Sequence, residues 1–177
     1  IYYGIPIGAN DTWNAEKAAK ALAQYDVVVF GAGLEEEKHS YHHSTKTVIS
    51  LMRQNNPKLK LFGYIDLGVA TDNLDMETIL SKSAKWKLLG ADGIFLDDAG
   101  YDFKVSRQRL NDAVNGIHEL EMAVFVNAWR PEDVLSDAVN KKYNPNGLPS
   151  ALDERDIYLL EDFLQPTDIN EPGSASV

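Results

Sequence analysis

The chain has 177 residues, of which 44% are hydrophobic and 25% are charged, so we expect one globular domain with a sizeable core. Its formal net charge of -10 at pH 7 argues against a nucleic-acid backbone or an anionic membrane surface as a partner. The absence of cysteine excludes disulfides, thiolate metal ligands and cysteine nucleophiles. No apolar run approaches the ~20 residues that a membrane-spanning helix needs, so membrane insertion is not expected.

Short apolar runs alternate with longer amphipathic stretches along the chain, which is typical of βα units and a parallel sheet. The apolar runs predict strands at residues 1–7, 26–30, 59–67, 93–97, 122–127 and 156–160. We therefore predict an α/β fold of the (β/α)8 TIM-barrel type that is incomplete, with about six βα units, because a complete barrel takes ~250 residues. Residues 1–164 would form the barrel domain, and residues 165–177, with proline, glycine and serine, a flexible tail or linker.

The ends of the chain leave several alternatives open. Ile1 lies inside a predicted strand and no initiator Met precedes it, which suggests that a leader or upstream domain has been removed. Because only six strands are predicted, the barrel is truncated, or other domains or subunits complete it, or the sheet stays open in a doubly wound arrangement. The run from Gly31 to Gly33 lacks the third glycine and the helix of a dinucleotide fingerprint, so no cofactor is expected.

Polar and aromatic side chains gather where the predicted strands end. In a parallel barrel the functional groups lie at the carboxyl ends of the strands. Carboxylates there can do acid–base work, an amide can bind hydroxyls and an aromatic ring can pack on a pyranose face. The sequence therefore predicts a sugar site at this rim, with the following residues at the strand ends: Tyr64, Asp66, Asp97, Asp98, Asn127, Trp129 and Glu161.

Glycosidase chemistry needs two carboxylates, and Asp97 and Glu161 are the predicted catalytic pair. Asp97 directly follows three apolar strand residues, which would hold it at the mouth of the barrel. The competing interpretation is that Asp97 and Asp98 cap the next helix, but Asp102 is better placed to do so. For Glu161 the competing interpretation is a solvated loop carboxylate. Asp98 and Asp66 are predicted to support the pair.

The remaining chemically active side chains have structural interpretations. Three histidines, His39, His42 and His43, lie near a loop–helix junction without carboxylates at ligand spacing, so we expect a solvated helix start and no metal. His118 comes late in a predicted helix, where it would interact with the helix dipole. The run from Glu35 to Glu37 predicts a solvated loop, and Trp86 a core residue.

Three segments resemble one family of glycoside hydrolases, the spherulin-4-like and endo-α-1,4-polygalactosaminidase-like enzymes. Residues 91–98 (ADGIFLDD) are similar to their fourth-strand "DGIFxD(E/D)" motif, which carries a catalytic aspartate. Residues 61–65 (LFGYI) and 2–6 (YYGIP) are similar to their third and first strands. The resemblance implies a (β/α)8 barrel that acts on amino-sugar polysaccharides, with Asp97 and Glu161 at the two catalytic positions. The chain departs from the pattern at Asp98, where many relatives have glutamate, and strands seven and eight are absent.

The leading hypothesis is a glycoside hydrolase of an exopolysaccharide or cell-wall glycan, located outside the cell or at its surface. Asp97 would act as base or nucleophile and Glu161 as general acid. Tyr3, Tyr64, Asn127 and Trp129 would contact the sugar. The alternative is a non-catalytic barrel module of a larger assembly, such as a phage tail, virion or surface-layer protein, which binds glycan or spaces other domains.

Overall fold

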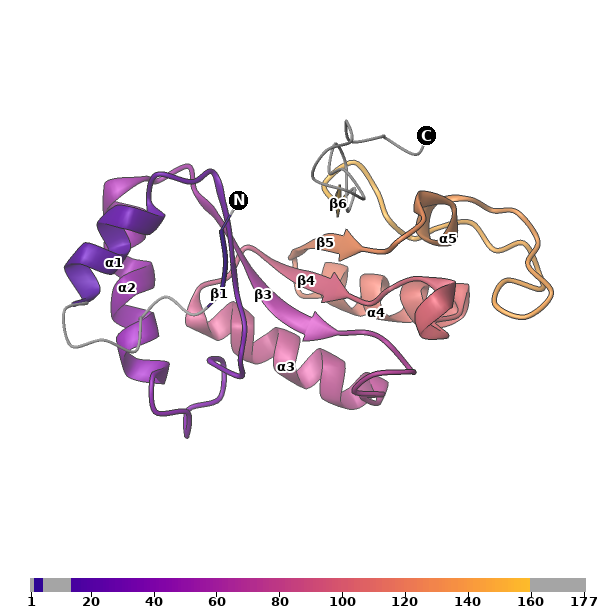
Figure 1. The fold of residues 1–177 in the computed structure, drawn as a ribbon, viewed down its shortest axis with the longest axis horizontal. Coiled ribbons are helices and arrows are strands. Elements are labelled where there is room, and N and C mark those ends of the chain that lie inside the picture. The colour runs from indigo at the N-terminus through magenta and orange to yellow at the C-terminus, as the bar shows by residue number, and fades with distance from the viewer. Residues whose placement is uncertain (1, 5–13, 160–177) are drawn as a thin grey trace, which may run out of the picture.

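A computed structural model describes residues 2–4 and 14–159 of the chain (Figure 1). Within these residues the strands form one parallel sheet in sequential order, with each strand paired to the next. Sequential order is the arrangement of a (β/α) barrel, whereas a doubly wound sheet reverses direction at a switch point. The incomplete barrel type is thereby confirmed. The strands are β1 (Tyr2–Gly4), β2 (Val27–Phe30), β3 (Lys60–Asp66), β4 (Gly93–Asp97), β5 (Ala123–Asn127) and β6 (Ile157–Leu159).

Helices connect the strands from β1 to β5, and a short helix with a long loop connects β5 to β6. Asn14, Asp75 and Ser106 accept a hydrogen bond from the backbone of the first turn of α1, α3 and α4. None of the helices in the described part of the chain has the length and apolar character to cross a bilayer. The elements are α1 (Ala15–Leu22), α2 (His42–Asn55), α3 (Met76–Leu89), the 3-10 helix η1 (Tyr101–Phe103), α4 (Arg107–Glu119) and α5 (Pro131–Leu135).

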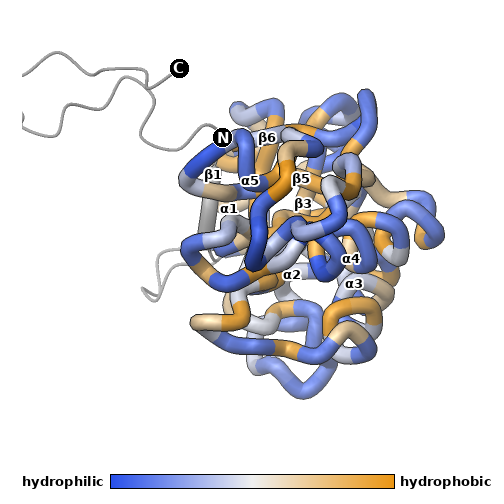
Figure 2. Tube along the Cα trace, turned by 90° about the vertical axis from the view of Figure 1, so that its right-hand side faces the viewer, coloured by the Kyte–Doolittle hydropathy of each residue, from blue (hydrophilic) through white to orange (hydrophobic). Residues whose placement is uncertain are grey.

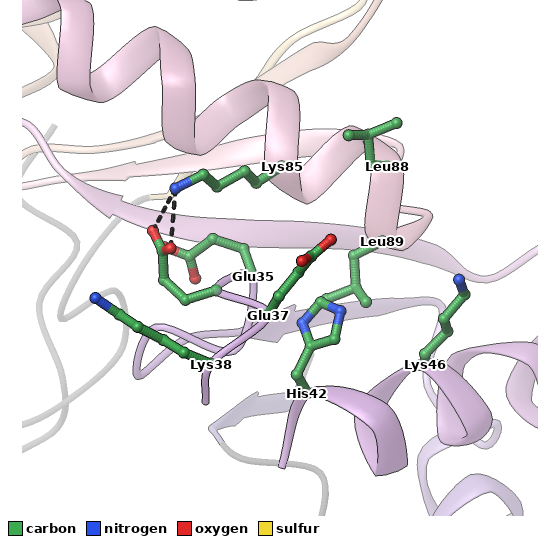
Figure 3. Close-up of a pocket in the computed structure, with 9 residues that line it drawn as sticks. Glu35, Glu37, Lys38, His42, Lys46, Lys85, Leu88 and Leu89 are labelled. Carbon is green, nitrogen blue, oxygen red and sulfur yellow. Dashed lines mark hydrogen bonds and ion pairs between the residues drawn. The ribbon is translucent and has the colours of Figure 1, made fainter. Parts of the chain in front are cut away.

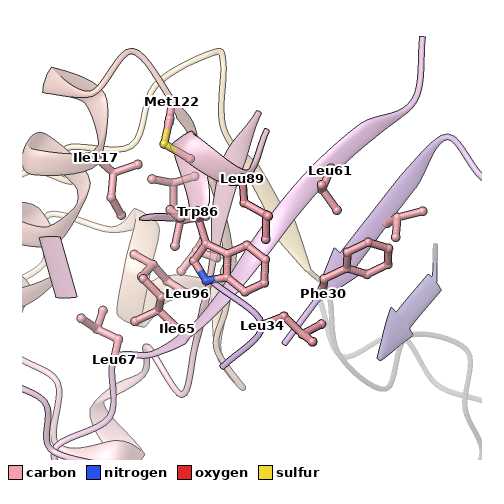
Figure 4. Packing of buried hydrophobic residues seen from close by; sticks show 14 of the residues in the cluster. Phe30, Leu34, Leu61, Ile65, Leu67, Trp86, Leu89, Leu96, Ile117 and Met122 are labelled. Carbon is pink, nitrogen blue, oxygen red and sulfur yellow. The ribbon is translucent and has the colours of Figure 1, made fainter. Parts of the chain in front are cut away.

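Alternate residues of the strands face the helices and form the main core (Figure 4). Figure 2 shows the contrast between hydrophobic strands, such as β3 and β5, and hydrophilic outer loops. Trp86 of α3 is fully buried in this core, as predicted. A Cβ atom at Gly63 of β3 would lie 2.2 Å from the Trp86 ring, so glycine is what lets α3 approach the sheet. The strand residues on this face are Val28, Phe30, Leu61, Ile65, Ile94, Leu96, Val124 and Val126.

The other face of the strands carries a second, aromatic cluster, formed by Val29, Phe62, Phe95 and Phe125. The ring centroids of Phe95 and Phe125 lie 5.0 Å apart at 86°, and those of Phe62 and Phe125 5.5 Å apart at 74°. Edge-to-face packing of this kind adds to the burial of the rings. In a closed barrel this face is the interior, and it leads directly to the ends of the strands.

Two local expectations are wrong, and a third is incomplete. Ser106, not Asp102, caps α4, and Asp102 lies in η1. Glu35 is not solvated, because it is only 2% exposed and its carboxylate pairs with Lys82. His118 does more than face the end of its helix, because its Nε2 lies 3.1 Å from the carboxylate of Asp156. In each case the actual partner comes from tertiary structure or from a neighbouring turn that the sequence pattern did not single out.

Candidate functional site at the strand ends

Asp66, Asp97 and Asn127 meet at the carboxyl ends of β3, β4 and β5. Each lies two residues after an aromatic residue of the face turned away from the helices, so strand alternation places all three on that face. Asp66 is the register partner of Asp97, and Asn127 follows the pair Leu96–Val126. The side chain of Asn127 donates a hydrogen bond from Nδ2 to Asp97 Oδ1 over 2.8 Å. The structure thus brings these three predicted site residues together.

Asp97 is held through one of its two oxygens. Its Oδ1 accepts hydrogen bonds from Asn127 Nδ2 and, over 3.0 Å, from the backbone N–H of Asp98. None of the described residues donates a hydrogen bond to Oδ2. Asn127 Oδ1 is buried and likewise has no hydrogen-bond partner among them. The Asp97 side chain is therefore oriented by its Oδ1, and its Oδ2 is available to a ligand.

Asp66 organises the loop that follows β3. It is only 7% exposed, and its Oδ1 accepts hydrogen bonds from Gly68 N over 2.6 Å and Thr71 Oγ1 over 2.7 Å. Arg109 of α4 fixes the same loop, because its guanidinium donates to the carbonyls of Leu67 and Leu74. Asp66 thus has a clear structural task beside its predicted supporting role.

Asp98, the residue after Asp97, has a raised pKa. Burial, with the negative charges of Asp97 and Asp66, raises the pKa of Asp98 from 3.8 to about 6, although the hydroxyl of Thr71 opposes the shift. Its backbone has a φ of 53°, in the left-handed region that aspartate tolerates better than most residues. Asp98 therefore holds a proton closer to neutral pH than an ordinary aspartate does, which is a property of acid–base sites.

The predicted aromatic contacts differ in position. The half-buried Tyr64 comes two residues before Asp66 on the same strand face, and its ring stacks on Phe95 with centroids 6.1 Å apart. Trp129 follows Asn127 by two residues and is 57% exposed. For Tyr3 the structure describes only the backbone, within β1, and Glu161 lies outside the described residues. Trp129 is thus an exposed ring just beyond the carboxyl end of β5.

Two other clusters of charged side chains lie away from this rim. A pocket of about 400 Å³ between α2 and α3 is lined partly by Glu36, His42 and Lys85 (Figure 3). Lys85 Nζ forms an ion pair with Glu36 Oε1 over 2.8 Å. None of the predicted site residues lines it. The histidine interacts with its own loop, since His42 Nδ1 lies 2.8 Å from the carbonyl oxygen of Leu34.

His118, Asp153 and Asp156 each offer an atom that could bind a metal ion, within 4.8 Å of one another. However, Asp156 also accepts hydrogen bonds from the backbone of Val124 and Asp153, and Asp153 pairs with Arg155. These partners satisfy the carboxylates without an ion. Because the cluster joins α4 to the beginnings of β5 and β6, it acts as a structural tie at the end of the sheet opposite the candidate site.

The comparisons with known proteins give information on the fold alone. No family profile matches the chain, and no curated protein matches its sequence. It resembles Rhizobium etli pyruvate carboxylase (9% identity, TM-score 0.53, covering 91% of this chain and 15% of the other). It also resembles the carboxyl transferase domain of the same enzyme with 3-bromopyruvate, with 11% identity and a TM-score of 0.51. That match covers 89% of this chain and 26% of the other. A putative phosphonomutase from Burkholderia cenocepacia gives 13% identity and a TM-score of 0.48, covering 82% and 57%.

The chain thus spans only part of the length of each of these proteins, from 15% to 57%. The likeness to the two pyruvate carboxylase structures agrees with a TIM-barrel fold. At such low identity it carries no information on the reaction, because one barrel fold hosts many unrelated chemistries.

Sequence reasoning missed the residues that hold the site in place. Thr71 and Arg109 bind the Asp66 carboxylate and its loop, and neither comes at the end of a strand. Thr71 lies in a turn rich in capping residues, which is a weak signal. Arg109 gives no signal, because its partners are carbonyls 42 and 35 positions away in the chain.

Proposed function

We propose that this chain is a glycoside hydrolase-like barrel that acts on an amino-sugar-containing polysaccharide by two-carboxylate catalysis. The observation that carries the proposal is the cluster of Asp66, Asp97 and Asp98 with Asn127, at the strand ends where barrel enzymes have their active sites. The resemblance of residues 91–98 to the fourth-strand motif of polygalactosaminidase-like enzymes supplies the substrate class. An exopolysaccharide or cell-wall glycan as substrate would place the protein outside the cell or at its surface.

Asp97 is proposed as the base or nucleophile. Its Oδ2 is available to a sugar or a water molecule, while Asn127 and the backbone of Asp98 hold Oδ1. A fixed carboxylate is what attack on an anomeric carbon requires, since small displacements cost rate steeply. Asp98, with its raised pKa, would modulate the charge around Asp97 and share a proton with its neighbours. Tyr64, Asn127 and Trp129 would contact the sugar.

Glu161 is proposed as the general acid, on the basis of the resemblance and of its position in the sequence. It follows Leu159, the register partner of Asn127, by two residues. The distance between the Asp97 and Glu161 carboxyl groups would predict the stereochemistry: about 5 Å favours retention of the anomeric configuration, and above about 6.5 Å favours inversion.

The proposal is tested by measuring reducing-end release from α-1,4-linked galactosamine polymers with wild type, Asp97→Asn and Glu161→Gln. Each substitution should lower the rate by about 10²- to 10⁴-fold, which is the contribution of a positioned acid or base. Asp137→Asn, which removes an exposed carboxylate, serves as the control and should keep the wild-type rate. If wild type cleaves the polymer and neither site variant loses rate, the catalytic pair is wrong. Binding without any cleavage would favour the non-catalytic glycan-binding module.

A further inference from the structure

A second cavity adjoins the carboxylate cluster on the side of β4 and β5. Its volume is about 520 Å³, within the about 300–1,000 Å³ that is typical of small-molecule sites. The segments that follow β4 and β5 supply its walls together with α5 and the loop after it. We call it the aromatic cleft, and its lining includes Tyr101, Asp102, Trp129, Arg130, Asp133 and Tyr143.

The aromatic cleft lies beside the carboxylate cluster, by which we mean Asp66, Asp97 and Asp98, because short segments of chain join the two. Tyr101 comes four residues after Asp97, and Trp129 two residues after Asn127. The backbone also ties the two regions together, because Ala99 N donates to the carbonyl oxygen of Asn127 over 3.0 Å. A polymer bound across Asp97 would therefore extend over the aromatic cleft if it ran toward the β4–β5 side.

Three aromatic rings line the cleft beside its polar side chains. Tyr101 and Tyr143 stack with ring centroids 5.3 Å apart and an interplanar angle of 20°. Trp129 is 57% exposed and lines the cleft, so its ring can meet a ligand there. An exposed indole beside polar side chains suits a pyranose, which has an apolar face and a rim of hydroxyls.

The wall that carries Tyr143 is held rigidly. Arg107 is fully buried, donates from its guanidinium to the carbonyls of Leu148 and Asp133, and donates from its backbone N–H to the carbonyl of Tyr143. Asn144 is 1% exposed, and its side chain forms three hydrogen bonds that close the same loop. The cleft is therefore preformed, which lowers the entropy cost of binding a ligand.

The charges of the cleft select among sugars. Two carboxylates, Asp102 and Asp133, line it against one guanidinium, Arg130. Burial raises the pKa of Asp133, and the charge of Asp102 adds to the rise, while a hydrogen bond from the Tyr101 N–H opposes it. Carboxylates accept hydrogen bonds from hydroxyls or ammonium groups and repel other carboxylates. The cleft thus fits a neutral or amino sugar and disfavours a uronic acid.

We propose that the aromatic cleft is a sugar subsite that binds a further neutral or amino pyranose unit of the glycan, one or more units away from the unit at Asp97. Trp129 supplies the stacking platform, the Tyr101–Tyr143 pair forms the wall, and Asp102 and Asp133 accept hydrogen bonds from the sugar. This inference rests on the proposed function for the identity of the polymer. It goes beyond that function by locating, in the aromatic cleft, the contacts that make longer oligosaccharides bind more tightly than short ones.

The test measures binding by titration calorimetry in an Asp97→Asn background, which prevents cleavage. The probes are α-1,4-linked galactosamine oligomers and β-1,4-linked N-acetylglucosamine oligomers of two, four and six units, with oligogalacturonates as the acidic probe. The background protein should bind one of the first two series more tightly as length increases. Trp129→Ala and Tyr143→Ala should each weaken the longer oligomers by about tenfold or more and remove most of the gain with length. Tyr41→Ala, at a 40% exposed tyrosine on a distant loop, should change nothing.

The outcomes separate this inference from the proposed function. Cleavage by wild type, combined with unchanged oligomer affinities in both aromatic variants, overturns the subsite and leaves the hydrolase intact. Length-dependent binding that both variants lose, without cleavage by wild type, supports the subsite and overturns the hydrolase. Equal affinity for oligogalacturonates, or no binding of any probe, overturns the subsite. Thermal unfolding of each variant, expected near that of the background protein, verifies that the fold is kept.

Discussion

At the scale of single residues, the contact between Asn127 and Asp97 fixes the orientation of the proposed catalytic carboxylate. An amide donor fixes Asp97 Oδ1 over 2.8 Å, and no described neighbour donates a hydrogen bond to Oδ2. Asn127 therefore acts as a positioning residue for Asp97, in addition to any contact that it makes with a sugar.

Replacing Asn127 by alanine should lower kcat by about 10- to 100-fold, because Asp97 would lose the donor that fixes its rotamer. A lost sugar contact alone would mainly raise KM, so the two parameters separate the roles. The measurement is steady-state cleavage of the galactosamine polymer, with Gln54→Ala, an exposed amide on α2, as the control. An unchanged kcat for Asn127→Ala would show that Asp97 is oriented without it.

The ionised Asp98 carboxylate should lower the free energy of unfolding at neutral pH. Its pKa is about 6 in the folded state against 3.8 for an ordinary aspartate, so the folded state binds more protons between these values. Stability is therefore lost as pH rises from about 4 to about 6, and the full cost is present above about 6. Asp98→Asn removes the charge and keeps a residue that tolerates a φ of 53°.

We expect Asp98→Asn to raise the free energy of unfolding by about 1–2 kcal/mol at pH 7, a value reduced for solvent screening of a partly exposed group. The gain should disappear below about pH 4. Urea unfolding from pH 4 to 8 measures it, and Asp112→Asn, at an exposed position on α4, should show no such pH dependence. A gain that is equal at pH 4 and pH 7 would contradict the electrostatic cause.

At this scale the sequence predicted the residues at strand ends and failed for those in loops. Asp66, Asp97 and Asn127 could be found because a strand has a two-residue period, so the last residue of an apolar run has a defined direction. Tyr101 and Tyr143 could not be paired, because their contact joins segments 42 positions apart whose shape depends on Arg107. Residues outside regular elements need tertiary structure to acquire a position.

At the scale of elements, β3 and α3 show how one small residue sets the spacing between layers. Gly63 faces Trp86, and its Cβ position lies 2.2 Å from the ring, well inside van der Waals contact. The two flanking helix-facing residues of β3, Leu61 and Ile65, are fully buried. Because the core is filled on both sides of Gly63, β3 cannot shift to make room for a larger side chain there.

Gly63→Ala should destabilise the protein by about 1–3 kcal/mol, as expected for overpacking of a well-filled core. Trp86→Ala removes the opposing ring, so the double substitution should cost less than the sum of the two single ones. Urea unfolding of the four proteins gives this coupling directly. Leu88→Ala, at a residue of α3 that is 84% exposed, is the control. Strict additivity would mean that Trp86 does not limit the space at Gly63.

The elements themselves were largely predictable, since β4 spans Gly93–Asp97 as expected and the other strands from β2 to β6 end within one residue of their predicted bounds. Hydrophobic runs of this length have few alternatives once glycine, proline and cap residues bound them. The start of α4 was placed less well, because Asp102 and Ser106 are both good caps in sequence. The 3-10 turn η1 occupies the first of them.

At the scale of the whole molecule, the sequential strand order makes the sheet a continuous surface whose two ends have different tasks. The carboxyl ends of β3, β4 and β5 gather the candidate site, and the amino ends of β5 and β6 are tied by Asp156. This division is common in barrels, where the carboxyl face carries chemistry and the amino face stability. The alternation of βα units in the sequence predicted the barrel type, but not which side chains would tie the last strand to the rest.

Asp156 should set the stability of β6 within the sheet. Its carboxylate accepts hydrogen bonds from Val124 N over 2.7 Å and Asp153 N over 2.8 Å, and it contacts His118 Nε2. Asp156→Ala would leave these donors without partners, and an unsatisfied buried donor costs about 1–3 kcal/mol. Because β6 pairs with β5 over only three residues, the loss should appear there first.

Hydrogen exchange followed by mass spectrometry measures this effect strand by strand. In Asp156→Ala the amides of β6 and of the first residues of β5 should exchange faster than in wild type by about tenfold or more, while β3 and β4 keep their protection. Glu154→Ala, an exposed carboxylate two residues away, should leave the pattern unchanged. Uniform loss of protection through β3 and β4 would instead show that the sheet opens as one unit, and that Asp156 stabilises the whole barrel rather than its last described strand.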